Sequence, residues 1–118
     1  MEIRGLGGAA FARALAAFGD GTPVTYRRMT LALRAAELEV RVPAPSAAQP
    51  LTTHRALDLL TRARYRLGAL LASAPPLEAA VGNRLPRLVL VDERHADVPL
   101  FELRGDRLRH LADPPDEE

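Results

Sequence analysis

The chain has 118 residues, a length that suffices for one domain with its own hydrophobic core. It contains no cysteine, which excludes disulfides, thiolate nucleophiles and cysteine-ligated metal centres. With a formal net charge of +1, no signal-peptide layout at the start and no apolar run of ~18 residues, we expect a soluble cytoplasmic protein without a membrane partner.

All sixteen basic residues are arginine, and lysine is absent. Both residue types make a soluble surface, so physical chemistry alone would mix them. The bias, together with 21 alanines and 20 leucines, indicates a GC-rich genome. An arginine cluster in this chain is therefore weaker support for phosphate or nucleic-acid binding than the same cluster would be in a mixed background.

Acidic residues are concentrated near the C-terminus. Residues 113–118 read Asp-Pro-Pro-Asp-Glu-Glu and hold four of the fifteen acids. Because so short and charged a segment cannot bury apolar surface, we expect a single domain over residues 1–112 and a disordered tail over 113–118. The remaining 16 arginines and 11 acids leave that domain with a net charge of +5.

The first predicted element is a helix over residues 6–18, which is built almost entirely from alanine and other apolar residues. One stripe of this helix carries its large side chains, Phe11, Leu15 and Phe18. The opposite face carries small residues at four-residue spacing, Gly8, Ala12 and Ala16. A helix that is apolar all round is buried on both sides or lies at an interface. Since small residues let another backbone approach closely, we predict an interface on this small-residue stripe.

Residues 23–43 are predicted to form two strands, because apolar and polar side chains alternate in two runs. Folding them about Ala35 and Ala36 places apolar partners on one face of a hairpin. These partners are Leu33 with Leu38, Leu31 with Val40, and Met29 with Val42. The other face pairs Arg34 with Glu37. Two alanines are poor residues for a tight turn, and residues 24–36 also suit a helix, which stays open as the alternative.

The next segments are a connector, a long helix and a short one. Residues 43–50 hold three prolines and predict an extended, exposed connector. A helix over 52–73 follows, with Thr52 or Thr53 as its N-cap. Its apolar residues recur at helical spacing over about six turns: Leu57, Leu60, Ala63, Leu67, Leu70 and Leu71. The two prolines at 75 and 76 end this helix. A short helix over 76–82 is expected next, with proline in its first turn and Gly82-Asn83 closing it.

The C-terminal third is predicted to be strand. Residues 88–91 are a continuous apolar run, which indicates a strand covered on both faces. Residues 100–111 predict a hairpin about Gly105 and Asp106. Its pairs are Leu103 with Leu108, Glu102 with Arg109, Phe101 with His110, and Leu100 with Leu111. The predicted fold class is therefore α+β, in the order α-β-β-α-(α)-β-β-β, with two main helices packed on a mostly antiparallel five-stranded sheet.

Two short glycine motifs resemble functional signatures but lack the required context. The run Gly5-x-Gly7-Gly8 has no strand before it, which a dinucleotide-binding turn requires. The run 104–106 spells the integrin-binding tripeptide, but a hairpin turn explains its Gly-Asp pair. We predict no cofactor from either motif.

A polar cluster lies between the two last strand regions, at Asp92, Glu93, His95 and Asp97. Carboxylates and an imidazole can hold a divalent cation or supply a base. An exposed loop has the same composition, and no second histidine stands at ligand spacing. We therefore assign no catalytic or metal-binding residue, and keep an enzyme that uses Asp92 and His95 as a distant alternative.

The long helix carries the best candidate for ligand binding. Arg55, Arg62 and Arg66 lie within about 40° of one another, opposite the leucines, with Tyr65 beside them. Guanidinium groups next to an exposed aromatic ring suit phosphates and a stacked base. Asp58 would partly neutralise Arg62. The pattern predicts either an anion or nucleic-acid site or a solvated helix face.

Arg64 belongs to the same helix but falls inside its leucine stripe, between Leu60 and Leu67. Burying an unpaired guanidinium is costly, so the side chain must reach water, a carboxylate or a partner. Structural pairing and an interface role are the two interpretations, and the second makes Arg64 a fourth candidate interface residue.

These features predict a small non-catalytic association or scaffold domain that forms a homodimer. The reasons are the all-apolar first helix, the arginine in the leucine stripe, and the lack of a catalytic or cofactor motif. A nucleic-acid or anion-binding module that uses the arginine face of the long helix is the alternative from another class.

Overall fold

Three helices and one six-stranded sheet are formed by the residues that the computed structural model describes, 1–45 and 51–113. The elements in chain order are α1 (Gly8–Gly19), β1 (Val24–Tyr26), β2 (Met29–Leu33), β3 (Glu37–Ala44), α2 (Thr53–Ser73), α3 (Pro75–Val81), β4 (Leu85–Asp92), β5 (Pro99–Arg104) and β6 (Arg107–His110). The α+β class is confirmed. The prediction of five strands is wrong, since β1 is a sixth.

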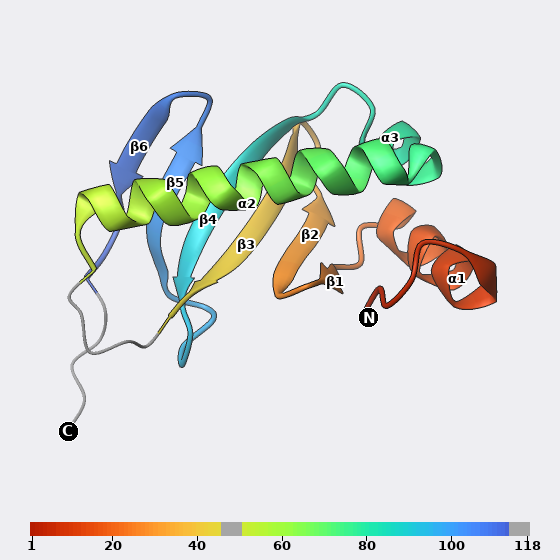
Figure 1. Ribbon diagram of the computed structural model, residues 1–118, viewed down its shortest axis with the longest axis horizontal. Coiled ribbons are helices and arrows are strands. Elements are labelled where there is room, and N and C mark those ends of the chain that lie inside the picture. The colour runs from red at the N-terminus through yellow and green to blue at the C-terminus, as the bar shows by residue number, and fades with distance from the viewer. Residues whose placement is uncertain (46–50, 114–118) are drawn as a thin grey trace.

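The strands lie in the sheet in the same order as in the chain. All neighbours are antiparallel except β3 and β4, which are parallel. A parallel pair needs a crossover, which α2 and α3 supply between β3 and β4. Each half of the chain therefore contributes an antiparallel three-stranded unit to one mixed sheet (Figure 1).

The helices cover one face of the sheet (Figure 1). The long helix α2 packs against β3, β4 and β5, while α1 packs against α3 and the first two strands. The core lies between these layers. Its largest fully buried side chains include Phe18, Leu31, Leu60, Leu88 and Leu103. In the described residues, one helical layer on a single sheet leaves the other sheet face without a covering helix.

Both predicted hairpins form in the predicted register. In the first, Leu31 lies opposite Val40 and Leu33 opposite Leu38. The pairs of the second are Leu103 with Leu108, Glu102 with Arg109, and Phe101 with His110. The amide of Leu111 also donates to the carbonyl of Leu100 at 2.8 Å. Alternation of apolar residues, and the Gly-Asp turn of the second hairpin, are sufficient to set these registers.

The predicted side-chain pair of Arg34 with Glu37 in the first hairpin is wrong. The amide of Arg34 donates to the Glu37 carbonyl at 2.9 Å. The Glu37 carboxylate, however, accepts from Nε of Arg104 at 2.9 Å, and Arg34 lies 3.6 Å from Glu39. The reason is tertiary, because β4 and β5 bring other arginines to the same sheet face.

Strand β1 was not expected as a separate element because its turn lacks the usual residues. The turn to β2 consists of Arg27 and Arg28, whose φ angles are 47° and 71°. Both angles lie in the left-handed region, where a tight hairpin normally places Gly or Asn. The outer edge of β1 is partly paired, since the amide of Ile3 donates to the Thr25 carbonyl at 2.7 Å.

The long helix begins and ends as predicted, with one exception in its core. The Thr52 hydroxyl accepts from the amide of Arg55 at 3.1 Å and caps the first turn of α2. Leu57 was expected in the core but is 41% exposed. The buried side of α2 is centred on Ala56, Leu60 and Ala63, and at about 100° per residue this turns Leu57 outward.

The connector and the tail are only partly described. Strand β3 continues through Pro43 to Ala44, so the predicted connector over 43–50 starts too early. Residues 46–50 and the predicted tail from 114 onward lie outside the described residues. None of the helices in the described ranges is long and apolar enough to span a membrane.

Candidate interaction surfaces

Arginines and glutamates alternate on the sheet face that no helix covers. On β3, Glu39 accepts from Nε of Arg41 at 3.0 Å. The same carboxylate lies 3.6 Å from guanidinium nitrogens of Arg34 and of Arg87 on β4. One carboxylate therefore serves three arginines, which leaves local positive charge in excess.

A second carboxylate on this face is the one buried charged residue among those described. Glu102 on β5 is 4% exposed and accepts from Nε of Arg87 at 2.7 Å. Arg104 and Arg109 lie 3.6 Å and 4.0 Å from it. Arg87 thus bridges Glu39 and Glu102. We call these residues the arginine–glutamate network: Arg34, Glu37, Glu39, Arg41, Arg87, Glu102, Arg104 and Arg109.

The network covers apolar residues that would otherwise face solvent. Ala32, Val89 and Val91 point to this face, and each is less than 5% exposed. The prediction that the 88–91 strand is covered on both faces is therefore confirmed, but ion pairs and arginine stems replace a second helical layer. The side chains described at the surface of this face are therefore largely charged.

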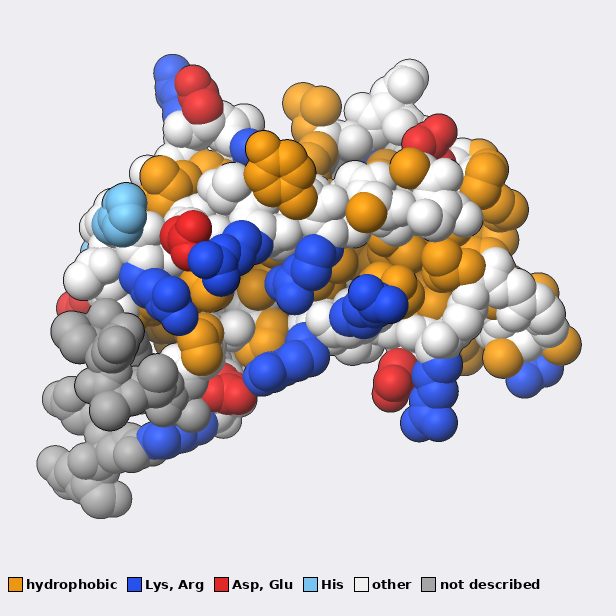
Figure 2. Space-filling view, viewed as in Figure 1, with side chains coloured by type: hydrophobic (Ala, Val, Ile, Leu, Met, Phe, Trp, Pro, Cys, Tyr) orange, Lys and Arg blue, Asp and Glu red, His pale blue; other side chains and the backbone are white. Residues whose placement is uncertain are grey.

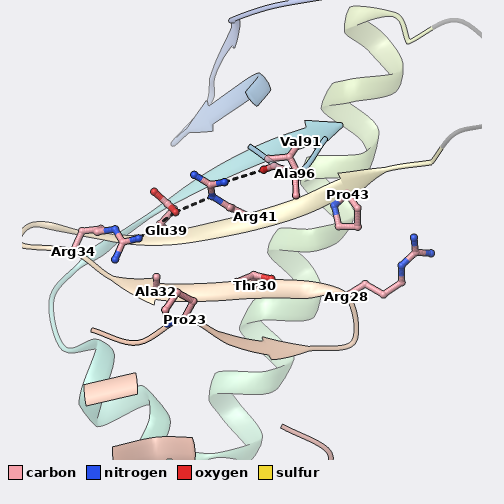
Figure 3. Close-up of a pocket in the computed structure, with 10 residues that line it drawn as sticks. All are labelled: Pro23, Arg28, Thr30, Ala32, Arg34, Glu39, Arg41, Pro43, Val91 and Ala96. Atoms are coloured by element: carbon pink, nitrogen blue, oxygen red, sulfur yellow. Dashed lines mark hydrogen bonds and ion pairs between the residues drawn. The ribbon is translucent and has the colours of Figure 1, made fainter. Parts of the chain in front are cut away.

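A groove of about 390 Å³ opens in this face over β2 and β3. Thr30 and Ala32 lie along it, with Arg34 at one end and Arg28 at the other (Figure 3). The remaining lining residues are Pro23, Glu39, Arg41, Pro43, Val91 and Ala96. The groove exists because β2 presents two small side chains between longer neighbours.

The predicted interface residues on α1 are exposed. This helix packs through Phe11, Ala14 and Phe18, which are buried. Gly8, Ala12 and Ala16 lie on the other side and are open to solvent. The described part of the chain does not cover this stripe, so its role in an interface stays a prediction.

The exposed residues of α1 and α3 form an end of the molecule that is poor in charge, which we call the α1–α3 surface. Figure 2 shows few charged side chains there. In these two helices only Arg13 and Glu78 are charged, and both are exposed. Neither side chain has an ion pair or hydrogen bond within the described part of the chain. Around them the exposed residues are mainly alanine, glycine and proline.

The arginines of α2 are exposed but lie on a flank of the helix. Basic side chains follow one side of α2 in Figure 2. Arg62, Arg66 and Tyr65 are exposed, and Arg55 is half-buried. The expected position opposite the core is wrong for the three arginines, since they lie about 100° from the centre of the buried side, whereas Tyr65 lies opposite that centre. Arg62 pairs with Asp58 at 3.2 Å, as predicted from their spacing.

Arg64 finds a partner inside the chain. Its Nη2 donates to the carbonyl of Gly105 in the turn between β5 and β6. The side chain is half-buried. The partner is a main-chain carbonyl instead of the expected carboxylate, and it ties the long helix to the C-terminal hairpin. An interface role for Arg64 stays a prediction.

The polar loop after β4 is organised around its own backbone. Oδ1 of Asp92 accepts hydrogen bonds from the backbone amides of Arg94 at 2.8 Å and of His95 at 3.2 Å. Nδ1 of His95 lies 3.7 Å from the same oxygen. No group of three or more His, Asp or Glu among the described residues is placed to hold a metal ion.

Sequence reasoning missed Arg13, Glu78 and the groove. Arg13 is a single charge in an otherwise apolar helix, and Glu78 belongs to a helix of seven residues. The available signal was the charge-poor composition shared by two separate helices. The groove had no comparable signal, because its residues come from β2, β3, β4 and several turns and loops.

Comparison with known proteins adds no relative: no family model matches the chain, and neither a curated protein nor a solved structure is significantly similar to it.

Proposed function

We propose that this chain is a non-catalytic association domain that forms a homodimer through the α1–α3 surface. The observation that carries the proposal is the charge pattern of that surface. One basic and one acidic side chain, Arg13 and Glu78, are exposed there with no ion pair in the described chain, amid small uncharged residues.

Self-complementarity favours a second copy as the partner. A two-fold contact places the same patch on both sides, so each residue pair occurs twice. Arg13 of one copy can then meet Glu78 of the other, and the reciprocal pair forms as well. The small residues Gly8, Ala12 and Ala16 allow the two α1 backbones to approach closely.

Charge reversal tests this pairing directly. Arg13→Glu or Glu78→Arg alone would place like charges together, which costs several kcal/mol at an interface. We expect each single variant to weaken dimerisation at least about tenfold, and the double variant Arg13→Glu/Glu78→Arg to recover most of the loss. Sedimentation velocity at about 30 µM measures the populations of monomer and dimer.

The matched control is Arg66→Glu, which reverses an exposed arginine on α2, away from this surface. Circular dichroism checks that every variant keeps its helix content. A monomeric unmodified protein at about 30 µM, or a double variant as weak as the singles, contradicts the proposal.

A nucleic-acid or anion-binding module remains the second candidate. The observation that favours it is the exposure of Arg62, Tyr65 and Arg66 on one half of α2. It ranks second because Arg62 already pairs with Asp58 and because every basic residue of the chain is arginine.

A further inference from the structure

The groove on the helix-free sheet face has a shape that suits an extended chain. Thr30 and Ala32 follow one another along β2 (Figure 3). Pro23 lies on one side, and Pro43 and Val91 lie on the other. The volume of about 390 Å³ falls within the range of ligand-binding pockets. The middle of the groove is therefore lined mostly by small or apolar side chains.

Its ends are basic. Arg34 lies at one end, whereas Arg41 lies alongside Thr30, and both contact Glu39, which Arg87 also contacts. The guanidinium of Arg41 is held in place, since its Nη1 donates to the Ala96 carbonyl at 2.9 Å. A fixed guanidinium loses little further freedom when it binds a carboxylate, which favours binding.

At the other end, Arg28 is held by a turn that departs from relaxed geometry. Arg27 and Arg28 both have positive φ, which costs about 1–2 kcal/mol for each non-glycine residue. Nη2 of Arg28 donates to Glu93 at 2.8 Å, and Arg27 lies over the ring of Tyr26 at 5.3 Å. An Asn-Gly turn would join the same strands without this strain. The strained turn places Arg28 at the mouth of the groove.

The spacing of the two ends selects the kind of occupant. Arg28 and Arg34 are six residues apart along an extended strand, or about 20 Å. A single carboxylate or phosphate cannot bridge that distance. An extended segment of about six residues can, with its acidic side chains near both ends.

We propose that this groove docks an extended acidic segment of a partner protein, with carboxylates near Arg28 at one end and Arg34 at the other, and with Arg41 beside the middle of the segment. Small apolar side chains of the segment lie over Thr30 and Ala32. None of the groove's lining residues belongs to the α1–α3 surface, so this proposal is independent of dimerisation.

The probe is a fluorescein-labelled heptapeptide, Asp-Glu-Ala-Val-Ala-Asp-Glu. The control peptide has Asn and Gln in place of the acids. Fluorescence anisotropy is measured with the full chain at about 0.01 M ionic strength, where charges act over about 30 Å. We expect the acidic peptide to bind and the neutral peptide not to bind.

Two matched double variants locate the site. Arg28→Gln/Arg34→Gln removes one arginine from each end of the groove and should weaken binding about tenfold. Arg62→Gln/Arg66→Gln removes two exposed arginines from α2 and should leave binding unchanged. In amide NMR spectra the peptide should shift the resonances of Thr30, Ala32 and Arg41 and leave the resonances of α2 unchanged.

Several outcomes overturn the proposal. These are no binding of the acidic peptide, equal losses in the two double variants, or a loss confined to the α2 pair. Inorganic phosphate that binds the same residues as tightly as the peptide would show an anion site instead of a docking site for a segment. Tighter peptide binding by a chain ending at Asp113 would identify residues 114–118 as the occupant in place of a partner.

Discussion

Arginine serves three different physical purposes at single positions of this chain. Arg64 donates to a carbonyl in a turn, and Arg87 bridges Glu39 and Glu102 under the surface of the open sheet face. Arg28 occupies a left-handed turn position. A chain whose basic residues are all arginine can still place them where their planar, multivalent hydrogen bonding matters.

Replacement of Arg64 separates stability from association. Arg64→Leu loses the hydrogen bond to the Gly105 carbonyl, and we expect the free energy of unfolding to fall by about 1 kcal/mol. Urea denaturation measures this change, with Arg66→Leu on the exposed flank of α2 as the control. An unchanged unfolding free energy combined with a lower oligomeric mass would instead assign Arg64 to an interface.

At the scale of elements, α2 has two distinct exposed regions. Its flank carries Arg55, Arg62 and Arg66, and its outermost line carries Tyr65, which is 77% exposed. The helix also contains Gly68 at an exposed position, where an added Cβ would meet no atom within 4 Å. The outer side of α2 therefore has no packing role in the described chain. Arg62 and Arg66 on the flank are exposed and accessible to a ligand.

The nucleic-acid alternative makes a salt-dependent prediction for α2. If Arg62 and Arg66 contact phosphates, neutralising both should reduce the slope of log K against log salt by about two. Filter binding or anisotropy with single- and double-stranded DNA measures the slope. We expect no complex tighter than micromolar at about 0.15 M salt, where exposed charges are screened beyond about 8 Å. A submicromolar, salt-sensitive complex would place this function first.

At the scale of the whole molecule, the arginine–glutamate network joins the two halves of the chain. Glu37 and Glu39 come from β3 in the first half, and Arg87, Glu102 and Arg104 come from β4 and β5 in the second. Arg104 reaches Glu37 across 67 residues of sequence. The parallel β3–β4 pairing, which α2 and α3 span, is thus reinforced by ion pairs on the opposite face.

Loss of the buried carboxylate should weaken this connection between the halves. Glu102→Gln removes the buried charge that Arg87 contacts at 2.7 Å but leaves Arg87 with Glu39, and we expect the free energy of unfolding to fall by about 2 kcal/mol. Asp58→Asn, which removes an exposed pair on α2, should cost no more than about 0.5 kcal/mol. Chemical denaturation compares the two, and similar losses would show that the network carries no special stability.

Much of the fold was predictable because its signals are local. The Thr52 cap and the helical period after it set α2, and the Gly105–Asp106 turn set the last hairpin. The Arg27–Arg28 turn was not predictable, because neither residue is typical of the left-handed conformation that it adopts. The exposed stripe on α1 could be named from its spacing alone, whereas its covering partner could not.

The sequence by itself determined which residues form α1, α2 and the two predicted hairpins, since periodicity and turn chemistry act over a few residues. It also determined which side of α1 and of these hairpins faces the core. Only the tertiary structure decided that β3 and β4 pair in parallel, which brings Glu39 opposite Arg87. It also decided that Pro23, Arg28 and Ala96 line one groove. Contacts of this kind depend on how distant elements cross over one another, and no local pattern of residues encodes that crossing.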